Sequence, residues 1–217
     1  MPVYNGMPYL QLAVESILRQ TYRNFEFIII DDCSSDDSLR YLKSLRDDRI
    51  VLIQQLQNGG VTRALQEGMV NVRGTYVARL DADDIAMPER LQVQIDFLDA
   101  NPEYGLIGSS YSTIDVCGNV LTSSAKWIND LEVRWKMLFK NPFVHSTVMF
   151  RKSIIDQHKL NYQTDHGEDY HLWSNILQYT KGCILEDTLV KYRIHEKSWT
   201  NTQIDNQLNA GKMLSFI

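Results

Sequence analysis

The chain has 217 residues, enough for one substantial hydrophobic core, and 44% of its residues are hydrophobic. A formal net charge of −5 excludes a nucleic-acid binder that works through a broadly basic surface. Three widely spaced cysteines give no CxxC pair, and no apolar run approaches the ~20 residues that span a bilayer. We therefore expect a cytoplasmic protein that can contact a membrane surface peripherally.

Strand and helix patterns alternate through the first half. Helices are predicted over residues 8–21, 34–45, 61–72 and 87–102, and strands over residues 25–31, 49–53 and 75–81. The strands are continuous apolar runs, as in sheets that helices cover on both faces. This order predicts an α/β fold with a mostly parallel sheet and flanking helices.

The second half, from about residue 105, loses this rhythm. Strands are predicted over 105–115, 119–124, 145–150 and 183–195, and helices over 130–139 and 167–179. In the helix over 130–139 we expect one side to face the core, formed by Leu131, Trp135, Leu138 and Phe139. We interpret residues 1–104 and 105–217 as two halves of one domain.

Both ends indicate a truncated domain. Met1 is followed at once by the turn sequence PVYNG, so the first strand is a stub, and the last residues stop within a helical pattern. That final helix would carry Ile204, Leu208 and Met213. It could pack on this chain or on a partner, which leaves the oligomeric state open.

Three acidic residues follow the strand predicted over 75–81. In an extended chain Asp81 and Asp83 would share one face, with Asp84 beside them. Paired carboxylates favour a cation, and Mg²⁺ or Mn²⁺ takes one or two of them together with phosphate oxygens and water. A solvated acidic loop before the next helix is an equally simple interpretation of these residues taken alone.

Polar residues also follow the two preceding strands. Asp31 and Asp32 end one of them, where a carboxylate can accept hydrogen bonds from a nucleotide base or a ribose hydroxyl. Asn58 and Gly60 end the next, where glycine lets the backbone approach a ligand closely. A plain turn explains Asn58 and Gly60 as well.

Five segments together carry a family resemblance: MPVYNG, SILRQTYRNFEFIIIDDCSSDDS, QNGGVTRALQEG, GTYVARLDADDIAMPERL and HGEDYHLW. In this order and spacing they resemble the family 2 glycosyltransferases. The resemblance implies the GT-A fold, a Rossmann-like α/β fold, and a metal-dependent enzyme that uses nucleotide-activated sugars. The DADD segment alone is weak, whereas the ordered set is specific.

The resemblance implies roles for the donor side. Pro2, Val3 and Tyr4 match the turn that contacts the base, and Asp32 matches the acid that binds the base, commonly uracil. Asn58 and Gly60 are assigned to donor binding.

The remaining roles lie nearer to the reaction. Asp81 and Ala82 match donor positions near the ribose. Asp83 matches the acid that holds the metal on the diphosphate, and His195 a histidine that reaches the metal or the diphosphate.

For catalysis, Asp169 matches the general base, with Glu168 beside it, in an inverting, single-displacement reaction. Because Asp169 opens a helix, we expect the helix dipole to keep it ionised and a weak base. His145 also falls on a motif position and is assigned to loop support. Cys33 stands where the family commonly has glycine, so we expect that turn to tolerate a side chain.

Two further inferences concern the substrates. The chain has no QxxRW motif and no transmembrane helix, which favours transfer of one sugar rather than processive synthesis. By analogy the acceptor is a carbohydrate or glycolipid of a bacterial surface polysaccharide, and no nucleic acid is involved.

Two other functions were considered for this sequence. A metal-dependent phosphohydrolase or nucleotidyltransferase would need a nucleophilic Asp or a Gly-rich phosphate loop after the first strand, and MPVYNG offers neither. The sequence is also compatible with a module that binds nucleotide but catalyses no reaction.

Overall fold

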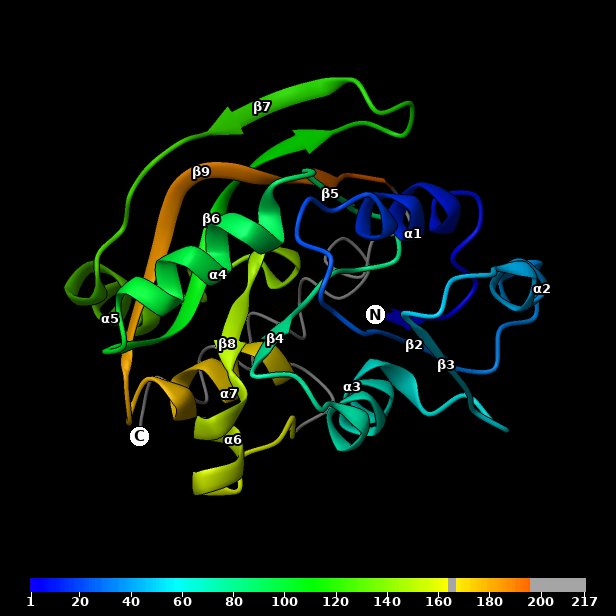
Figure 1. Ribbon diagram of the computed structural model, residues 1–217. Coiled ribbons are helices and arrows are strands. Elements are labelled where there is room, and N and C mark those ends of the chain that lie inside the picture. Colours follow the sequence, from blue (N-terminus) through cyan, green and yellow to red (C-terminus); the bar gives the residue numbers. More distant parts are fainter. Residues whose placement is uncertain (164–166, 196–217) are drawn as a thin grey trace.

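A computed structural model of the protein describes residues 1–163 and 167–195 (Figure 1). Within these residues the strands form a three-stranded sheet and a six-stranded sheet. The three-stranded sheet is parallel, in the order β1 (Pro2–Val3), β2 (Phe27–Asp31) and β3 (Ile50–Gln54). The expected stub of a first strand is thus a two-residue strand, which pairs with the end of β2.

Three helices accompany this sheet, as the alternation predicted. They are α1 (Leu10–Leu18), α2 (Ser38–Ser44) and α3 (Gly60–Asn71). The i, i+4, i+7 spacing of Leu10, Val14 and Ile17 turns one side of α1 inward, and all three are buried against Ile29 of β2 and Leu42 of α2.

The six-stranded sheet has the order β4-β8-β6-β9-β5, with β7 paired to β6. Its strands are β4 (Tyr76–Ala78), β5 (Ile85–Ala86), β6 (Tyr104–Ile114), β7 (Val120–Ser124), β8 (Met149–Arg151) and β9 (Lys181–Arg193). Its long central pair, β6 and β9, is parallel and the other pairs are antiparallel. The prediction of a mostly parallel sheet therefore holds for β1, β2 and β3, whereas β4 and β5, also in the first half, pair antiparallel with β8 and β9.

The remaining helices pack around this second sheet. They are α4 (Arg90–Ala100), α5 (Asp130–Met137), the 3₁₀ turn η1 (His145–Thr147), α6 (Lys152–His158) and α7 (Glu168–Ile176). The strand predicted over 145–150 begins only at Met149, because His145–Thr147 form η1. Trp173 of α7 is fully buried and packs against Phe150 and Tyr162, so it belongs to the core.

The prediction for α5 is wrong. Leu131, Trp135, Leu138 and Phe139 are exposed, and the helix buries Val133 and Met137 instead. Both sets follow helical spacing, so the pattern alone could not say which side faces inward.

No helix among the described residues is long and apolar enough to cross a membrane. The final helix predicted around Ile204, Leu208 and Met213 lies outside the described residues.

Candidate active site

The acidic segment after β4 is a turn, not an extended strand. Strand β4 ends at Ala78, and the N–H of Asp84 donates to the carbonyl oxygen of Asp81 at 3.4 Å. The expectation that Asp81 and Asp83 share a face through strand alternation is therefore wrong. Each of the three carboxylates has its own partners, contributed by different elements.

Asp81 is held by Arg79 and Ser146. Arg79 Nη2 donates to Asp81 Oδ1 at 2.5 Å, and the Ser146 hydroxyl donates to Asp81 Oδ2 at 3.0 Å. Burial alone would raise the pKa of Asp81, but the charge of Arg79 and these hydrogen bonds outweigh burial and lower the pKa to about 2. Asp81 is thus an anion fixed in place by a buried cation.

Asp83 meets His195 from the other end of the chain. His195 Nε2 lies 2.9 Å from Asp83 Oδ2, and 112 residues separate the two. Arg193, the last residue of β9, donates from Nε to the carbonyl oxygen of Asp83 at 2.9 Å. The His195 ring also packs on Tyr9, with centroids 5.2 Å apart. The end of β9 thereby positions the imidazole over the acidic turn.

Asp84 is structural. Its side chain is fully buried, and its Oδ1 accepts from the N–H of Arg193 at 2.8 Å. Burial, together with the charges of Asp83 and Asp81, raises the pKa of Asp84 well above its usual value. The alternative of a solvated acidic loop is therefore excluded, because this turn is bound to β9.

The residues assigned to the base lie after β1 and β2. Val3 is buried in the core, Pro2 is half-buried and Tyr4 is exposed. The turn after β1 lies against the acidic turn, since a Cβ on Gly6 would be 3.6 Å from the Cβ of Ala82. These two sequence motifs therefore meet at one edge, as their positions at strand ends predicted.

Asp32 holds the loop before α3. Its two carboxylate oxygens accept from the N–H groups of Gly59 and Gly60, each at 2.8 Å, and Asn58 Nδ2 donates to the carbonyl oxygen of Asp32 at 3.3 Å. The side chain of Asp32 is 2% exposed. In this structure Asp32 fixes the Asn58–Gly60 loop, and its contact with a base stays a prediction.

Cys33 adopts a left-handed backbone conformation, with φ of 62°. The expectation that this turn would suit a side chain is wrong, because this region favours glycine. The cysteine occupies a glycine-like turn.

Glu168 and Asp169 form the first turn of α7, directly after Gly167. Asn141 Nδ2 donates to Asp169 Oδ2 at 2.8 Å. Burial raises the pKa of Asp169 to about 6, and burial with the charge of Asp169 raises the pKa of Glu168 to about 7. Asp169 is therefore ionised at pH 7, as expected, but the expectation of a weak base is wrong, since burial outweighs the backbone hydrogen bonds that lower its pKa.

His145 lies behind these acids. Its Nδ1 is 4.0 Å from Glu168 Oε1, and its Nε2 is 3.3 Å from the hydroxyl of Tyr162. Burial and the charge of Arg79 lower the pKa of His145 well below its usual value, so the ring is neutral at pH 7. His145 is adjacent in sequence to Ser146, which binds Asp81, and its own ring lies near Glu168. This segment therefore contacts both acidic clusters.

Comparison with known proteins shows which family the chain belongs to. The sequence profile of Glycosyl transferase family 2 matches residues 1–159. The chain belongs to this family. An uncharacterized glycosyltransferase of Haemophilus influenzae is 32% identical over 232 residues, covering 97% of this chain and 69% of the relative. The O-antigen biosynthesis glycosyltransferase WbnJ of Escherichia coli is 31% identical over 205 residues, covering 91% of this chain and 79% of WbnJ.

Solved structures show the same fold. S. aureus TarS 1–349 in complex with UDP-GlcNAc matches with a TM-score of 0.76 and 19% identity, over 91% of this chain and 58% of that chain. Mannosyltransferase PcManGT from Pyrobaculum calidifontis, in complex with GDP-Man and Mn²⁺, matches with a TM-score of 0.73 and 17% identity. The match covers 62% of the PcManGT chain. The present chain therefore spans less than two thirds of either solved structure. The fold of this glycosyltransferase is thus the GT-A fold, as expected.

The fold implies a divalent metal, and two side chains of this glycosyltransferase fit one. Asp83 Oδ2 and His195 Nε2 are 2.9 Å apart, and an oxygen and an imidazole nitrogen both suit Mn²⁺. No cluster of three His, Cys, Asp or Glu side chains in residues 1–163 and 167–195 could hold a metal. A bound ion would therefore take its other ligands from substrate phosphate and water, as Mg²⁺ commonly does.

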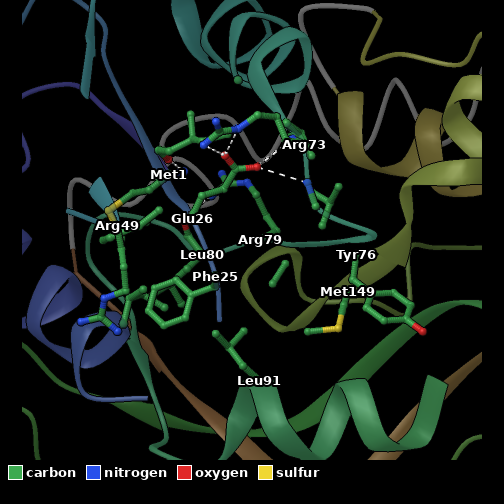
Figure 2. Close-up of a pocket in the computed structure, with 18 of the residues that line it drawn as sticks. Met1, Phe25, Glu26, Arg49, Arg73, Tyr76, Arg79, Leu80, Leu91 and Met149 are labelled. Atoms are coloured by element: carbon green, nitrogen blue, oxygen red, sulfur yellow. Dashed lines mark hydrogen bonds and ion pairs between the residues drawn. The ribbon is translucent and has the colours of Figure 1, made fainter. Parts of the chain in front are cut away.

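A cavity of about 830 Å³ borders this site at Arg79, the partner of Asp81 (Figure 2). It lies between β2 and β4, beside Met1, and its lining includes Phe25, Leu80 and Leu91 but none of the predicted site residues. The two sheets do not pair across it. The cavity is therefore a gap between the two sheets, and no residue predicted for the donor site lines it.

The sequence reasoning missed Arg79, Ser146 and Asn141, which hold the site carboxylates. Arg79 had a signal, because it lies two residues before Asp81, at a spacing where side chains can meet. Ser146 and Asn141 come from distant segments, and nothing in their local sequence marks them.

Proposed function

We propose that this glycosyltransferase moves one sugar from a UDP-sugar to an acceptor hydroxyl, with inversion at the sugar carbon. Support for a UDP donor comes from the likeness to TarS bound to UDP-GlcNAc, while PcManGT holds GDP-Man. Single displacement requires two functions from the protein: the leaving diphosphate must be stabilised, and the attacking hydroxyl must lose its proton. The two acidic clusters supply one function each.

One observation carries the proposal. Burial is the largest cause that raises the pKa values of Asp83, Glu168 and Asp169, and the charge of Asp81 raises each of them further. Acids from the turn after β4 and from the start of α7 are therefore within electrostatic reach of one another. Such a group of carboxylates, with different partners and different protonation, is typical of an active site.

Asp83 and His195 are the proposed metal ligands. When bound there, Mg²⁺ or Mn²⁺ would act as a Lewis acid on the departing diphosphate. The protein orients this pair through Arg193, whose Nε donates to the backbone carbonyl oxygen of Asp83 and whose backbone N–H donates to the carboxylate of Asp84. The fixed anion of Asp81 adds negative charge next to the pair.

Asp169 is the proposed general base. A pKa of about 6 leaves the carboxylate ionised at pH 7 while making it more basic than an ordinary aspartate. Asn141 donates to one oxygen of Asp169 and the N–H of Tyr170 donates to the other, and a carboxylate oxygen can accept a further hydrogen bond from the acceptor hydroxyl. Glu168, with a pKa raised to about 7, is proposed as the auxiliary acid beside it.

The two halves of the chain take different substrates in this proposal. Residues 1–104 bind the donor, through Pro2, Val3, Tyr4 and Asp32 on the base side and Asn58, Gly60, Asp81 and Ala82 on the ribose and diphosphate side. Residues 105–217 bind the acceptor. WbnJ is named for O-antigen biosynthesis, so we propose a carbohydrate or glycolipid acceptor of a bacterial surface polysaccharide and a cytoplasmic location.

The test is calorimetric titration with UDP, GDP and CDP, each with and without Mn²⁺. We expect UDP to bind, and to bind at least about tenfold more tightly with Mn²⁺. Tighter binding of GDP would move the donor class to GDP-sugars. UDP binding without transfer to any acceptor and without hydrolysis of UDP-sugars would favour a nucleotide-binding module. No binding by any nucleotide would contradict the donor site.

A further inference from the structure

Helix α5 and the turn after it expose four large apolar side chains. The exposed fractions are 79% for Leu131, 62% for Trp135, 57% for Leu138 and 68% for Phe139. We call these four residues the α5 face. Contiguous exposed apolar side chains of this size mark an interaction surface more often than isolated ones do.

The aromatic pair in the α5 face is ordered although it is exposed. The rings of Trp135 and Phe139 pack edge to face, with centroids 5.4 Å apart and an interplanar angle of 64°. A preformed aromatic pair loses little conformational freedom when a partner covers it. The face is therefore ready to bind without rearrangement.

The charges around the α5 face are mostly basic. Between residues 126 and 140 the chain carries four cations, Lys126, Arg134, Lys136 and Lys140, and two anions, an excess of two in a protein of net charge −5. Three of the four cations pair with the two anions, Arg134 with Asp130 at 2.9 Å and Lys126 and Lys136 with Glu132 at 3.1 and 3.2 Å, so the segment keeps a net excess of two positive charges. The surface next to the aromatic pair thus attracts an anionic partner.

The α5 face is joined to the candidate base. Asn141, two residues after Phe139, donates to Asp169 at 2.8 Å. The hydroxyl of Tyr170, the residue after Asp169, donates to the carbonyl oxygen of Met137 in α5. Because Met137 is on the buried side of α5, a partner covering the α5 face would lie across this helix from the start of α7.

We propose that the α5 face docks the protein on an anionic lipid bilayer. Tryptophan and phenylalanine beside lysine and arginine are the combination that inserts at the interface of anionic membranes. A second copy of the chain fits less well, because a two-fold contact would place the same cations opposite each other.

Docking would place the start of α7 one helix diameter, ~10 Å, from the membrane surface, with α5 between them. This part rests on the proposed function, because it brings Asp169 near an acceptor whose lipid part stays in the bilayer. The docking itself does not depend on catalysis.

The test is co-sedimentation with vesicles of phosphatidylglycerol and phosphatidylcholine, compared with phosphatidylcholine alone. We expect binding only to the anionic vesicles, reduced at high salt. Replacing the aromatic pair (Trp135→Ser with Phe139→Ser) should weaken binding at least about tenfold, and Lys136→Gln with Lys140→Gln should weaken it severalfold. Leu56→Ser and Val70→Ser remove exposed apolar side chains elsewhere, at 97% and 79% exposure, and should change nothing.

Two results would overturn the docking proposal. One is that the wild type and the Trp135→Ser, Phe139→Ser variant bind anionic vesicles equally well, or that neither of them binds. The other is a dimer, seen by light scattering, that this variant dissolves while vesicles bind neither protein. Titration with UDP and Mn²⁺ separates the two proposals. Nucleotide binding by the variant shows that the variant is folded. If the wild type does not bind nucleotide, that result counts against the proposed function and not against docking.

Discussion

The two acidic clusters of this glycosyltransferase use the same residue types in opposite ways. After β4, Asp81 is paired with the buried cation of Arg79, and the pKa of Asp81 falls to about 2. At the start of α7, Asp169 has an amide and a backbone N–H as partners but no cation, and burial raises its pKa to about 6. Asp81 therefore keeps its charge to a lower pH than Asp169, because Asp81 is paired directly with a buried guanidinium and Asp169 is not.

This difference matches the two tasks that sugar transfer sets. A site for cation and diphosphate needs permanent charge and fixed geometry, whereas a general base needs a pKa near the working pH. The comparison predicts that substitutions in the two clusters will separate donor binding from transfer.

The largest expected effect is that of Asp169→Asn. Removing the base should slow transfer by about 10²–10⁴-fold, the usual contribution of general acid–base catalysis. Donor affinity should stay unchanged, because the amide can still accept from Asn141. Single-turnover transfer and calorimetry measure the two quantities. Near-normal transfer would move the role of base to Glu168.

Asp83→Ala should instead impair metal-dependent donor binding. Without its oxygen ligand, the gain in UDP affinity on adding Mn²⁺ should fall by at least about tenfold. Asp37→Ala removes an exposed acid that pairs with Arg40, and serves as the matched control. If Asp83→Ala and Asp37→Ala respond alike to Mn²⁺, the metal assignment fails.

The pH dependence should follow Asp169. Below its pKa of about 6 the base is protonated, so kcat/KM should fall about tenfold per pH unit, and it should level off above that pH. The folded protein binds this proton more tightly than the unfolded chain, so the carboxyl favours folding most at low pH and this contribution disappears as the pH rises through about 6. Asp169→Asn should remove the acidic limb of the profile for its residual activity and be at least as stable as the wild type at pH 8.

The smallest expected effect lies outside both clusters. Cys33→Gly relieves the left-handed backbone at φ 62° and should stabilise the fold by roughly 0.5–1 kcal/mol, after the greater entropy of glycine in the unfolded chain is counted. Cys117, also exposed, does not have a positive φ, so Cys117→Gly should give no gain. Urea unfolding of the two variants measures the difference. Equal shifts would show that the turn at Cys33 is not strained.

The sequence predicted the first half of the fold well, because strands such as β2 and helices such as α1 carry strong, repeated patterns. It could not predict which side of α5 is buried, since Val133 with Met137 and Leu131 with Trp135 have the same spacing. Alternation failed at Asp81 and Asp83 because β4 ends three residues earlier than the apolar run suggests.

The candidate site was predictable in its residues and not in its electrostatics. The meeting of Asp83 with His195 was expected from the family resemblance, and the structure places them 2.9 Å apart. The pKa of Asp169 was misjudged, because the helix position is visible in the sequence while burial is a property of the packed structure.

The central claim is that Asp169 is a base tuned by burial. The most direct test is titration of its side-chain carboxyl by ¹³C NMR in the free protein, with Asp169→Asn to assign the signal. The account predicts a midpoint near 6. A midpoint near the ordinary value of 3.8 would contradict it, and the two acidic clusters would then not differ in the way proposed here.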